Sequence, residues 1–480
     1  MNLRRLPAIA VVLVSLVVLV VLGVSRPAPM TPLFASLGAP TAPFVPKLDF
    51  VTSSWFCPGV PVGGAGLGGS VIVANPGDTV LNGTITVFTD AAGTAAIAQP
   101  FEVPLRDTKT IDLPGIQPNG SYVSALVEIT GGGGFVEQTA ASPAGRAVAP
   151  CANSTSNHWF FADGYTKDAS TEDVVITNPF PDDAIVNFAL ATVEGSRSPA
   201  ALQGFPVRGH SISVVKLASV VRDDAVVAVS VTSTRGRIVV ARAQTYLGAA
   251  RAGFTMDLGA PSLSDQYWFA DGEVGPGINE RYSVYNGSGD EAVVQAVFLG
   301  IDPGSGFGND DPAQQLTIPA GGVATLSTAD IKDLPTGRHG VVFSSTTSGS
   351  ILVERALTRP AGNGVATTVV LGQQPRAAVQ RWSMAIGSSM QLENVLVVLN
   401  ADNEAATVTV KVLGPGGEQV VPGMESIALP AGAVISLGLS DPTALGHPLV
   451  VESTSRIFVE RLLPRAADLR GRSGSFALPG

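Results

Sequence analysis

The sequence is poor in charged residues, and this shortage limits the partners that the protein can have. Charged side chains make up only 14% of the 480 residues, and 39 acidic against 29 basic side chains give a net charge of −10. Nucleic-acid binding needs a surface rich in Lys and Arg that neutralises phosphates. We therefore expect no nucleic-acid partner.

Histidine is also scarce, which argues against most catalytic and metal centres. The histidines are His158, His210, His339 and His447, and they are spread over the chain. A metal site or a Ser-His-Asp triad needs its side chains to converge. The sequence also lacks the local motifs of zinc peptidases, α/β-hydrolases and P-loop proteins. We therefore expect a protein that is not an enzyme and that holds no cofactor.

Glycine, proline and hydrophobic residues are abundant instead. The chain has 54 Gly and 35 Pro, and 45% of its residues are hydrophobic. Gly and Pro interrupt helices, so a helical bundle is excluded. A chain this apolar is not a disordered polymer either. The composition predicts an all-β protein with many turns.

The N-terminal segment has the pattern of a membrane anchor. Arg4 and Arg5 precede an apolar run from Ala8 to Val24, which as a helix crosses most of a hydrocarbon core of about 30 Å. We expect a signal anchor and transmembrane helix over residues 1–25, in a single-pass protein of the cell membrane with its C-terminal region outside. The alternative is secretion after cleavage at Gly23-Val24-Ser25. The proline-rich residues 26–49 are predicted to form a semi-rigid spacer.

The rest of the chain consists of four copies of one unit. The copies open with Trp55-Phe-Cys-Pro-Gly59, Trp159-Phe-Phe-Ala-Asp-Gly164, Tyr267-Trp-Phe-Ala-Asp-Gly272 and Trp382-Ser-Met-Ala-Ile-Gly387. A β-branched run then ends at Asn75, Asn178, Asn286 or Asn400, and a hairpin built on proline follows. The copies close with Phe135-Val-Glu-Gln138, Val239-Val-Ala-Arg242, Leu352-Val-Glu-Arg355 and Phe458-Val-Glu-Arg461. These landmarks place repeat 1 at residues 50–152, repeat 2 at 153–261, repeat 3 at 262–376 and repeat 4 at 377–470, with a C-terminal tail over 471–480.

The length of the repeats predicts their fold. Each spans about 100–115 residues and has room for seven or eight short strands, which matches an immunoglobulin-like β-sandwich. A propeller blade has four strands in about 40–50 residues, so a propeller is rejected. We predict four tandem immunoglobulin-like β-sandwich domains after a single N-terminal transmembrane helix. Because each repeat is long enough to bury its own core, we expect the domains to lie in a row.

The two cysteines, Cys57 and Cys151, take equivalent places at the two ends of repeat 1. Cys57 lies where repeat 2 has Phe161, and Cys151 lies where repeats 2 and 3 have Gly259 and Gly372. We predict a disulfide that ties the first and last strands of repeat 1 together in an oxidising compartment. Two buried free thiols are the alternative.

The order of these motifs resembles repeats of secreted and cell-surface proteins of actinobacteria. As a whole, the chain resembles the actinobacterial family of unknown function DUF5719 over about residues 50–470. The resemblance implies an extracytoplasmic, sandwich-like, non-catalytic envelope protein, and it brings no catalytic residues with it. Repeat 1 departs from the pattern at Cys57-Pro58 and Glu137-Gln138, and repeat 2 departs from it at Ala241-Arg242.

Three sets of side chains are candidates for a binding role. The evenly spaced Arg242, Arg355 and Arg461 could recognise an anionic envelope polymer, with cross-strand ion pairing as the alternative. The aromatic residues Trp159, Tyr267 and Trp382 could stack on sugars, with core packing as the alternative. Asp163, Asp168 and Asp173 are a weak calcium candidate because calcium prefers oxygen ligands, with a solvated acidic loop as the alternative.

Together these observations favour a non-catalytic protein of the cell envelope. We expect a scaffold or binding module for an envelope glycan or an envelope protein, attached to the membrane by its N-terminal helix. A surface adhesin and an accessory subunit of an envelope enzyme are the alternatives.

Overall fold

The computed structural model describes residues 43–46, 52–300, 314–346, 350–385, 394–414, 416–444, 446–463 and 473–480. The predicted transmembrane helix over residues 1–25 lies outside this range, as does most of the predicted spacer. Within the described residues, no helix has the length and apolar character needed to span a membrane. Almost every regular element is a β-strand, which confirms the all-β prediction.

Each of the first three repeats folds into two antiparallel sheets. In repeat 1 the first sheet has the order β1 (Thr52–Phe56), β7 (Tyr122–Thr130), β4 (Leu81–Thr89) and β5 (Ile97–Val103), with β2 (Val60–Pro61) also on β7. The second sheet has the order β6 (Thr108–Asp112), β3 (Gly68–Ala74), β8 (Phe135–Ser142) and β9 (Gly145–Pro150). A single helical turn, α2 (Leu113–Ile116), follows β6.

Repeats 2 and 3 follow the same plan. The first sheet of repeat 2 has the order β10 (His158–Gly164), β16 (Val227–Arg235), β12 (Ala184–Thr192) and β13 (Gly195–Arg197), with β14 (Phe205–Val207) also on β12. Its second sheet has the order β15 (Ser211–Lys216), β11 (Thr171–Asn178), β17 (Val239–Leu247) and β18 (Ala252–Leu258). The first sheet of repeat 3 has the order β19 (Gln266–Val274), β24 (Gly337–Ser345), β21 (Ala292–Leu299) and β22 (Gln314–Ile318). Its second sheet has the order β23 (Val323–Ser327), β20 (Asn279–Asn286), β25 (Ile351–Ala361) and β26 (Gly364–Leu371). Side chains along β12 and β21 alternate between buried and more exposed positions, as expected for strands with one face on a core.

In repeat 4 one long strand, β33 (Leu449–Leu463), takes part in both layers. Its first half pairs with β27 (Val379–Met384) and β29 (Ala406–Gly414), and its second half pairs with β28 (Asn394–Asn400) and β34 (Ser473–Phe476). The remaining strands are β30 (Gly417–Val420) and β31 (Ile427–Leu429) on β29, β32 (Val434–Leu439) on β28, and β35 (Leu478–Pro479) on β27. The pairings therefore repeat those of the other three units.

The strand-ending asparagines make the same corner in every repeat. The side-chain Nδ2 of Asn178 donates to the carbonyl of Asp182 at 2.8 Å and to that of Val207 at 3.2 Å. Its Oδ1 accepts the backbone N–H of Phe180 at 3.1 Å. Asn75, Asn286 and Asn400 make the equivalent bonds. This side chain satisfies buried backbone groups of the following turn and ties it to the strand before the next hairpin.

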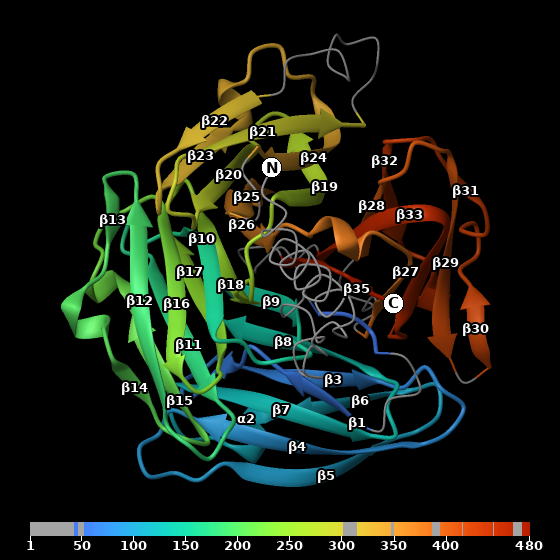
Figure 1. The fold of residues 1–480 in the computed structure, drawn as a ribbon. Helices are drawn as coiled ribbons and strands as arrows, with labels where there is room; N and C mark the ends of the chain where they lie inside the picture. Colours follow the sequence, from blue (N-terminus) through green and yellow to red (C-terminus); the bar gives the residue numbers. More distant parts are fainter. Residues whose placement is uncertain are drawn as a thin grey trace, which may run out of the picture. The chain divides into compact units, whose positions relative to one another are not determined.

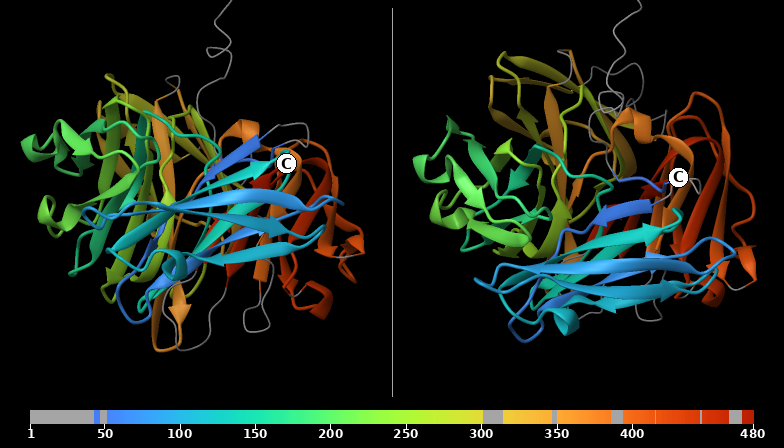
Figure 2. Two further views of the ribbon diagram at one scale, coloured as in Figure 1. Left: turned by 90° about the horizontal axis from the view of Figure 1, so that it is seen from below. Right: turned by 60° about the horizontal axis from the view of Figure 1, so that its bottom comes forward.

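The four repeats close on one another instead of lying in a row. Their last strands meet in a cycle, since β9 contacts β18, β18 contacts β26, β26 contacts β34, and β34 contacts β9. Figure 1 shows the repeats in this cyclic order, from blue through green and yellow to red, and the views in Figure 2 agree. The hydrophobic cores are also shared, because Ala162 and Val226 of repeat 2 belong to the core of repeat 3. The prediction of independent domains in a row is therefore wrong, because each repeat buries part of its apolar surface on the next one.

The two ends of the described chain also belong to this ring. The segment 471–480, predicted as a tail, contains β34 and β35, so repeat 4 includes the last residues of the sequence. The described part of the predicted spacer packs on the repeats as well. The backbone N–H of Phe44 donates to Asn153 Oδ1 at 2.7 Å, and that of Val45 donates to the Pro479 carbonyl at 2.8 Å.

Candidate functional site

The repeated Glu-Arg motif forms ion pairs between neighbouring repeats. Arg242 of repeat 2 makes two hydrogen bonds to Glu354 of repeat 3, at 2.9 and 3.1 Å. Arg355 of repeat 3 binds both oxygens of Glu460 of repeat 4, one of them at 3.2 Å. Arg461 of repeat 4 lies 3.2 Å from Glu137 of repeat 1. All six side chains are at most 2% exposed. The arginine of each of these repeats therefore pairs with the glutamate of the next repeat around the ring.

The Ala-Asp-Gly motif completes the same contact. Glu354 Oε2 accepts the backbone N–H groups of Ala162 at 2.8 Å and Asp163 at 2.6 Å. Glu460 Oε2 accepts the backbone N–H of Asp271 at 3.0 Å. The opening motif and the arginine of one repeat thus form a socket for the glutamate of the next, and charge-assisted bonds of this kind fix orientation strongly.

The aspartates of this motif are buried among arginines. Asp163 accepts bonds from Arg251 at 2.8 Å, Arg281 at 3.3 Å and Ser283 at 2.6 Å, of which the last two belong to repeat 3. Burial alone raises the pKa of Asp163, but Arg251 and Arg281 outweigh it and hold that pKa well below its usual range. Asp271 lies against Arg338, Arg355 and Arg359, which lower its pKa to about 2 in spite of burial. Both carboxylates therefore stay ionised.

At the junction between repeats 1 and 2, the two motif positions hold neutral side chains. Gln138 takes the place of the arginine, and Ala241 takes the place of the glutamate. Gln138 turns to its own repeat, where its side chain accepts the Gly59 N–H at 2.8 Å and also donates to the Gly59 carbonyl. Across the junction, Tyr122 donates to Asp173 at 2.9 Å, and the hydroxyls of Ser124 and Thr177 lie 2.8 Å apart.

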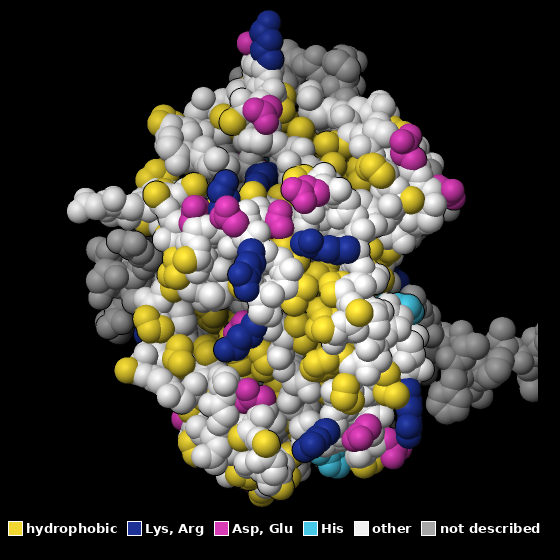
Figure 3. Space-filling view, turned by 90° about the vertical axis from the view of Figure 1, so that its left-hand side faces the viewer, with side chains coloured by type: hydrophobic (Ala, Val, Ile, Leu, Met, Phe, Trp, Pro, Cys, Tyr) yellow, Lys and Arg dark blue, Asp and Glu magenta, His cyan; other side chains and the backbone are white. Residues whose placement is uncertain are grey.

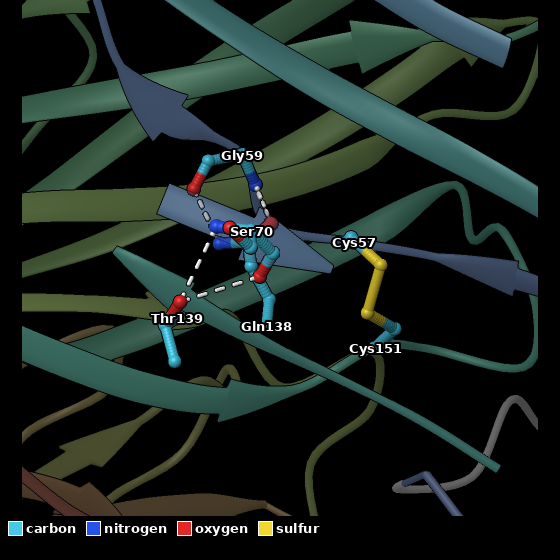
Figure 4. Close-up of a disulfide and its surroundings, with 6 residues drawn as sticks. All are labelled: Cys57, Gly59, Ser70, Gln138, Thr139 and Cys151. Carbon is cyan, nitrogen blue, oxygen red and sulfur yellow. Dashed lines mark hydrogen bonds between the residues drawn. A yellow bond between two sulfur atoms is a disulfide. The ribbon is translucent and has the colours of Figure 1, made fainter. Parts of the chain in front are cut away.

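The predicted disulfide is confirmed. Cys57 and Cys151 are bonded, with an S–S distance of 2.01 Å. Figure 4 shows the bond next to the hydrogen bonds between Gln138 and Gly59. In repeat 2 the same position holds a ring against a glycine, because a Cβ added to Gly259 would lie 2.8 Å from the Phe161 ring. Phe269 and Gly372 of repeat 3 pack in the same way. The disulfide thus replaces a Phe–Gly contact.

The other sequence candidates are buried as well. Arg242, Arg355 and Arg461 are the ion-pair residues described above. Trp159, Tyr267 and Trp382 are at most 1% exposed, and the indole N–H groups donate to the carbonyls of Ile238 and Ile457, both at 2.9 Å. Neither set therefore lies at the surface, where a polymer would bind.

The three aspartates of the weak calcium candidate have separate partners. Asp168 accepts from Tyr165 and Asp173 accepts from Tyr122, both at 2.9 Å, while Asp163 binds arginines. No group of three or more metal-ligating side chains forms within the described part of the chain. The structure does not bring these aspartates together as a cation site.

One more carboxylate, Glu172, is fully buried beside the Arg242–Glu354 pair. Within the described residues, neither of its oxygens has a hydrogen-bond partner, because the nearby Tyr165 N–H donates to Gln244. Burial raises the pKa of Glu172 to about 8, although Arg242 lowers it. The equivalent Glu280 of repeat 3 contacts His339 at 3.1 Å and accepts from Tyr282 at 2.5 Å. Burial therefore favours the protonated form of Glu172 near neutral pH.

A cavity of about 80 Å³ lies where the last strands meet. Its walls come from all four repeats and include Ala149, Asp257, Val370 and Ser475, with Pro43 from the N-terminal segment. Sequence reasoning missed this site. The only available signal was that the four residues occupy equivalent places on the last strands, opposite Gln138, Arg242, Arg355 and Arg461.

Comparison with solved structures gives no fold assignment. Thermotoga maritima 1070 is 13% identical, with a TM-score of 0.20 over 23% of this chain and 92% of that one. A Streptomyces avermitilis alpha-L-rhamnosidase complexed with L-rhamnose is 7% identical, with a TM-score of 0.13 over 83% and 55%. A tetra-tandem repeat from the extending region of a large adhesion protein is 12% identical, with a TM-score of 0.08 over 86% and 95%. These scores are too low to support any argument.

Comparison of the sequence with protein families is decisive where structures are not. No curated protein matches the chain. The profile of a family of unknown function, DUF5719, matches residues 135–381. This match extends from the closing strand of repeat 1 to the opening strand of repeat 4, and it includes Glu137, Arg242, Glu354 and Arg355. It covers more than half of the sequence, and the chain therefore belongs to the DUF5719 family.

Proposed function

We propose that this protein is a non-catalytic scaffold of the cell envelope, in which four immunoglobulin-like domains display a binding surface for an envelope glycan or an envelope protein. The observation that carries the proposal is the use of the repeated charged motifs. Arg242, Arg355 and Arg461 all pair with glutamates of the next repeat. The most distinctive residues of the repeats therefore serve to orient one domain against another.

Buried ion pairs favour a role in geometry over a role in stability. Removing two charges from water costs about as much as their attraction returns, so such pairs add little net stability compared with hydrophobic contacts. They do penalise any arrangement in which one charge loses its partner. A protein that repeats this device at several junctions is suited to holding surface loops of different domains at set positions, as a scaffold requires.

The disulfide supports a position outside the cytoplasm. Cys57 and Cys151 are bonded, and such bonds persist in oxidising compartments. We propose that residues 1–25 anchor the protein as a single membrane-spanning helix with the repeats on the outer side, with secretion after cleavage as the alternative.

The outer surface is the part left for partners. Figure 3 shows one face, on which hydrophobic side chains gather between scattered acidic and basic ones. Repeat 2 contributes three exposed large hydrophobic residues, Phe180 at 41%, Val193 at 73% and Leu247 at 58% exposure. Single exposed hydrophobic residues are normal on any protein, so these three residues do not define a binding site.

A binding experiment with two ligand classes tests the proposal. The full chain, immobilised in detergent, is exposed to increasing amounts of purified wall polysaccharide or of a purified envelope membrane protein fraction. Saturable binding by one class, lost on heat denaturation of the chain, is expected. Binding of neither class by a chain whose circular dichroism is native would overturn the proposal, and chemical turnover of the polysaccharide would contradict a non-catalytic role.

A further inference from the structure

The cavity at the meeting point of the repeats has one charged wall. The residues opposite the motif arginines or glutamine are Ala149, Asp257, Val370 and Ser475, and all four line the cavity. Three repeats thus complete the ring with an uncharged residue at this position. The fold does not require a carboxylate there, so Asp257 needs another explanation.

Asp257 has unused hydrogen-bonding capacity. Its Oδ2 is buried and has no hydrogen-bond partner among the described residues, and the same is true of Oε1 of Gln373, which also lines the cavity. Buried polar atoms are normally satisfied, and an unsatisfied one calls for an explanation such as a bound group. Two acceptors in a largely apolar cavity favour a ligand that donates hydrogen bonds.

Asp257 shares its neighbouring cation, Arg242, with another carboxylate. Arg242 lies opposite Asp257 on β17 and attracts it, but two nitrogens of that guanidinium already bind both oxygens of Glu354 on β25. The Thr255 hydroxyl on β18 is neutral and acts on Asp257 as a hydrogen-bond donor, which lowers the pKa of Asp257. Burial raises the pKa of Asp257 to about 7, with Arg242 lowering it and Glu354 raising it. A cation entering the cavity would therefore meet a carboxylate that is only partly ionised at neutral pH.

We propose that this cavity binds a primary ammonium group on a short aliphatic stem, with the Asp257 carboxylate as its counter-ion. The ammonium group supplies hydrogen-bond donors for Oδ2 of Asp257 and Oε1 of Gln373, and the stem contacts apolar walls such as Val370 and Phe476. Since one buried water needs about 10–15 Å³ of cavity space, a cavity of about 80 Å³ has room for a group of several heavy atoms. This site is separate from the scaffold function, and either proposal can fail without the other.

The test compares a charged probe with an uncharged probe of similar shape. n-Butylammonium and n-butanol are titrated into the full chain in detergent, with thermal unfolding and calorimetry as readouts. We expect n-butylammonium alone to raise the unfolding temperature at pH 8. At pH 7 we expect a binding heat that depends on the buffer, because ammonium binding displaces the proton from Asp257. A blocked Gly-Lys-Gly peptide, added in a parallel arm, distinguishes a lysine side chain of a polypeptide from a free amine as the natural source.

Two variants make the result specific. Asp257→Asn keeps the shape and removes the charge, and it should weaken n-butylammonium binding by about tenfold or more while the chain remains folded. Asp441→Asn, at a carboxylate that does not line the cavity, should leave binding unchanged. Equal binding to the Asp257→Asn variant, equal effects of n-butanol and n-butylammonium, or no binding of either amine probe would each overturn the proposal.

Discussion

Repeats 2 and 3 meet through a buried ion pair at the Glu-Arg motif positions, whereas repeats 1 and 2 have neutral side chains at those positions. Between repeats 2 and 3, Arg242 and Glu354 form an ion pair with two hydrogen bonds. Between repeats 1 and 2, the equivalent positions hold Gln138 and Ala241. The two departures from the Glu-Arg motif thus lie at one and the same junction. Each would be harmful alone, because it would leave a buried charge without a partner.

A junction can form without the ion pair, but the arginine and the glutamate must be present or absent together. The repeats pack on each other at both junctions, so the ring does not need charges to close. Where charges are present, however, both must be. Repeat 1, which lacks the arginine, is also the repeat that holds the disulfide, so its opening segment is held by a covalent bond and by Gln138.

The largest effect should come from removing one member of a pair. Glu354→Ala removes both hydrogen-bond acceptors of Arg242 and also frees the backbone N–H groups of Ala162 and Asp163. We expect a loss of about 3–5 kcal/mol in the free energy of unfolding, measured in urea. The double variant Arg242→Gln with Glu354→Ala copies the neutral junction and should recover at least half of this loss. If the two single losses simply add, the charges do not act as a unit.

The second-largest effect should come from replacing the disulfide of repeat 1 by the Phe–Gly contact of repeats 2 and 3. Converting both Cys57 and Cys151 to Ala opens a link between residues 94 positions apart, and should lower the free energy of unfolding by about 2–4 kcal/mol. Cys57→Phe with Cys151→Gly installs the pair found in repeats 2 and 3, and should recover part of the loss. A Phe–Gly variant no more stable than the Ala–Ala variant would show that the two contacts are not equivalent.

A pH effect should distinguish repeat 2 from repeat 3. The folded-state pKa of Glu172 is raised to about 8 from 4.5, so the folded chain binds more protons than the unfolded chain between these values. Stability should therefore fall as the pH rises from 5 to 8, by about 2 kcal/mol between pH 6 and 8, and then level off. Asp163 and Asp271, with lowered pKa values, lose their contribution only in acid, below this window.

Urea unfolding at pH 6 and pH 8 measures this effect, with Glu172→Gln as the matched variant. The variant should lose most of the pH dependence, although Asp257 contributes to the same window below about pH 7. A wild-type protein that becomes more stable between pH 6 and pH 8 would contradict a protonated Glu172.

How far the sequence predicted these features depends on how local they are. The strands and the Cys57–Cys151 bond were predicted, because hydrophobic period, turn residues and equivalent positions mark them, whereas the asparagines were found only as landmarks at the ends of strands. The ring was not predicted, because it rests on contacts such as Arg242 with Glu354, which are 112 residues apart. One signal was present, since Gln138 and Ala241 depart from the motif in complementary ways, but it has meaning only once the pairing between repeats is known. The cavity where the last strands of the repeats meet has no signal in any short stretch of the sequence.

The smallest effect should come from building a charge pair into the neutral junction. Gln138→Arg with Ala241→Glu should change the free energy of unfolding by about 1 kcal/mol or less, because a buried pair roughly breaks even against neutral packing. Each single variant should be clearly destabilising, since it buries one unpaired charge and, for Gln138→Arg, also removes the bonds to Gly59. A double-mutant cycle in urea measures the coupling, and a coupling energy near zero would mean that the two positions do not face each other across the junction. A strong coupling would show that the ring accepts either chemistry at this junction, provided that both partners change together.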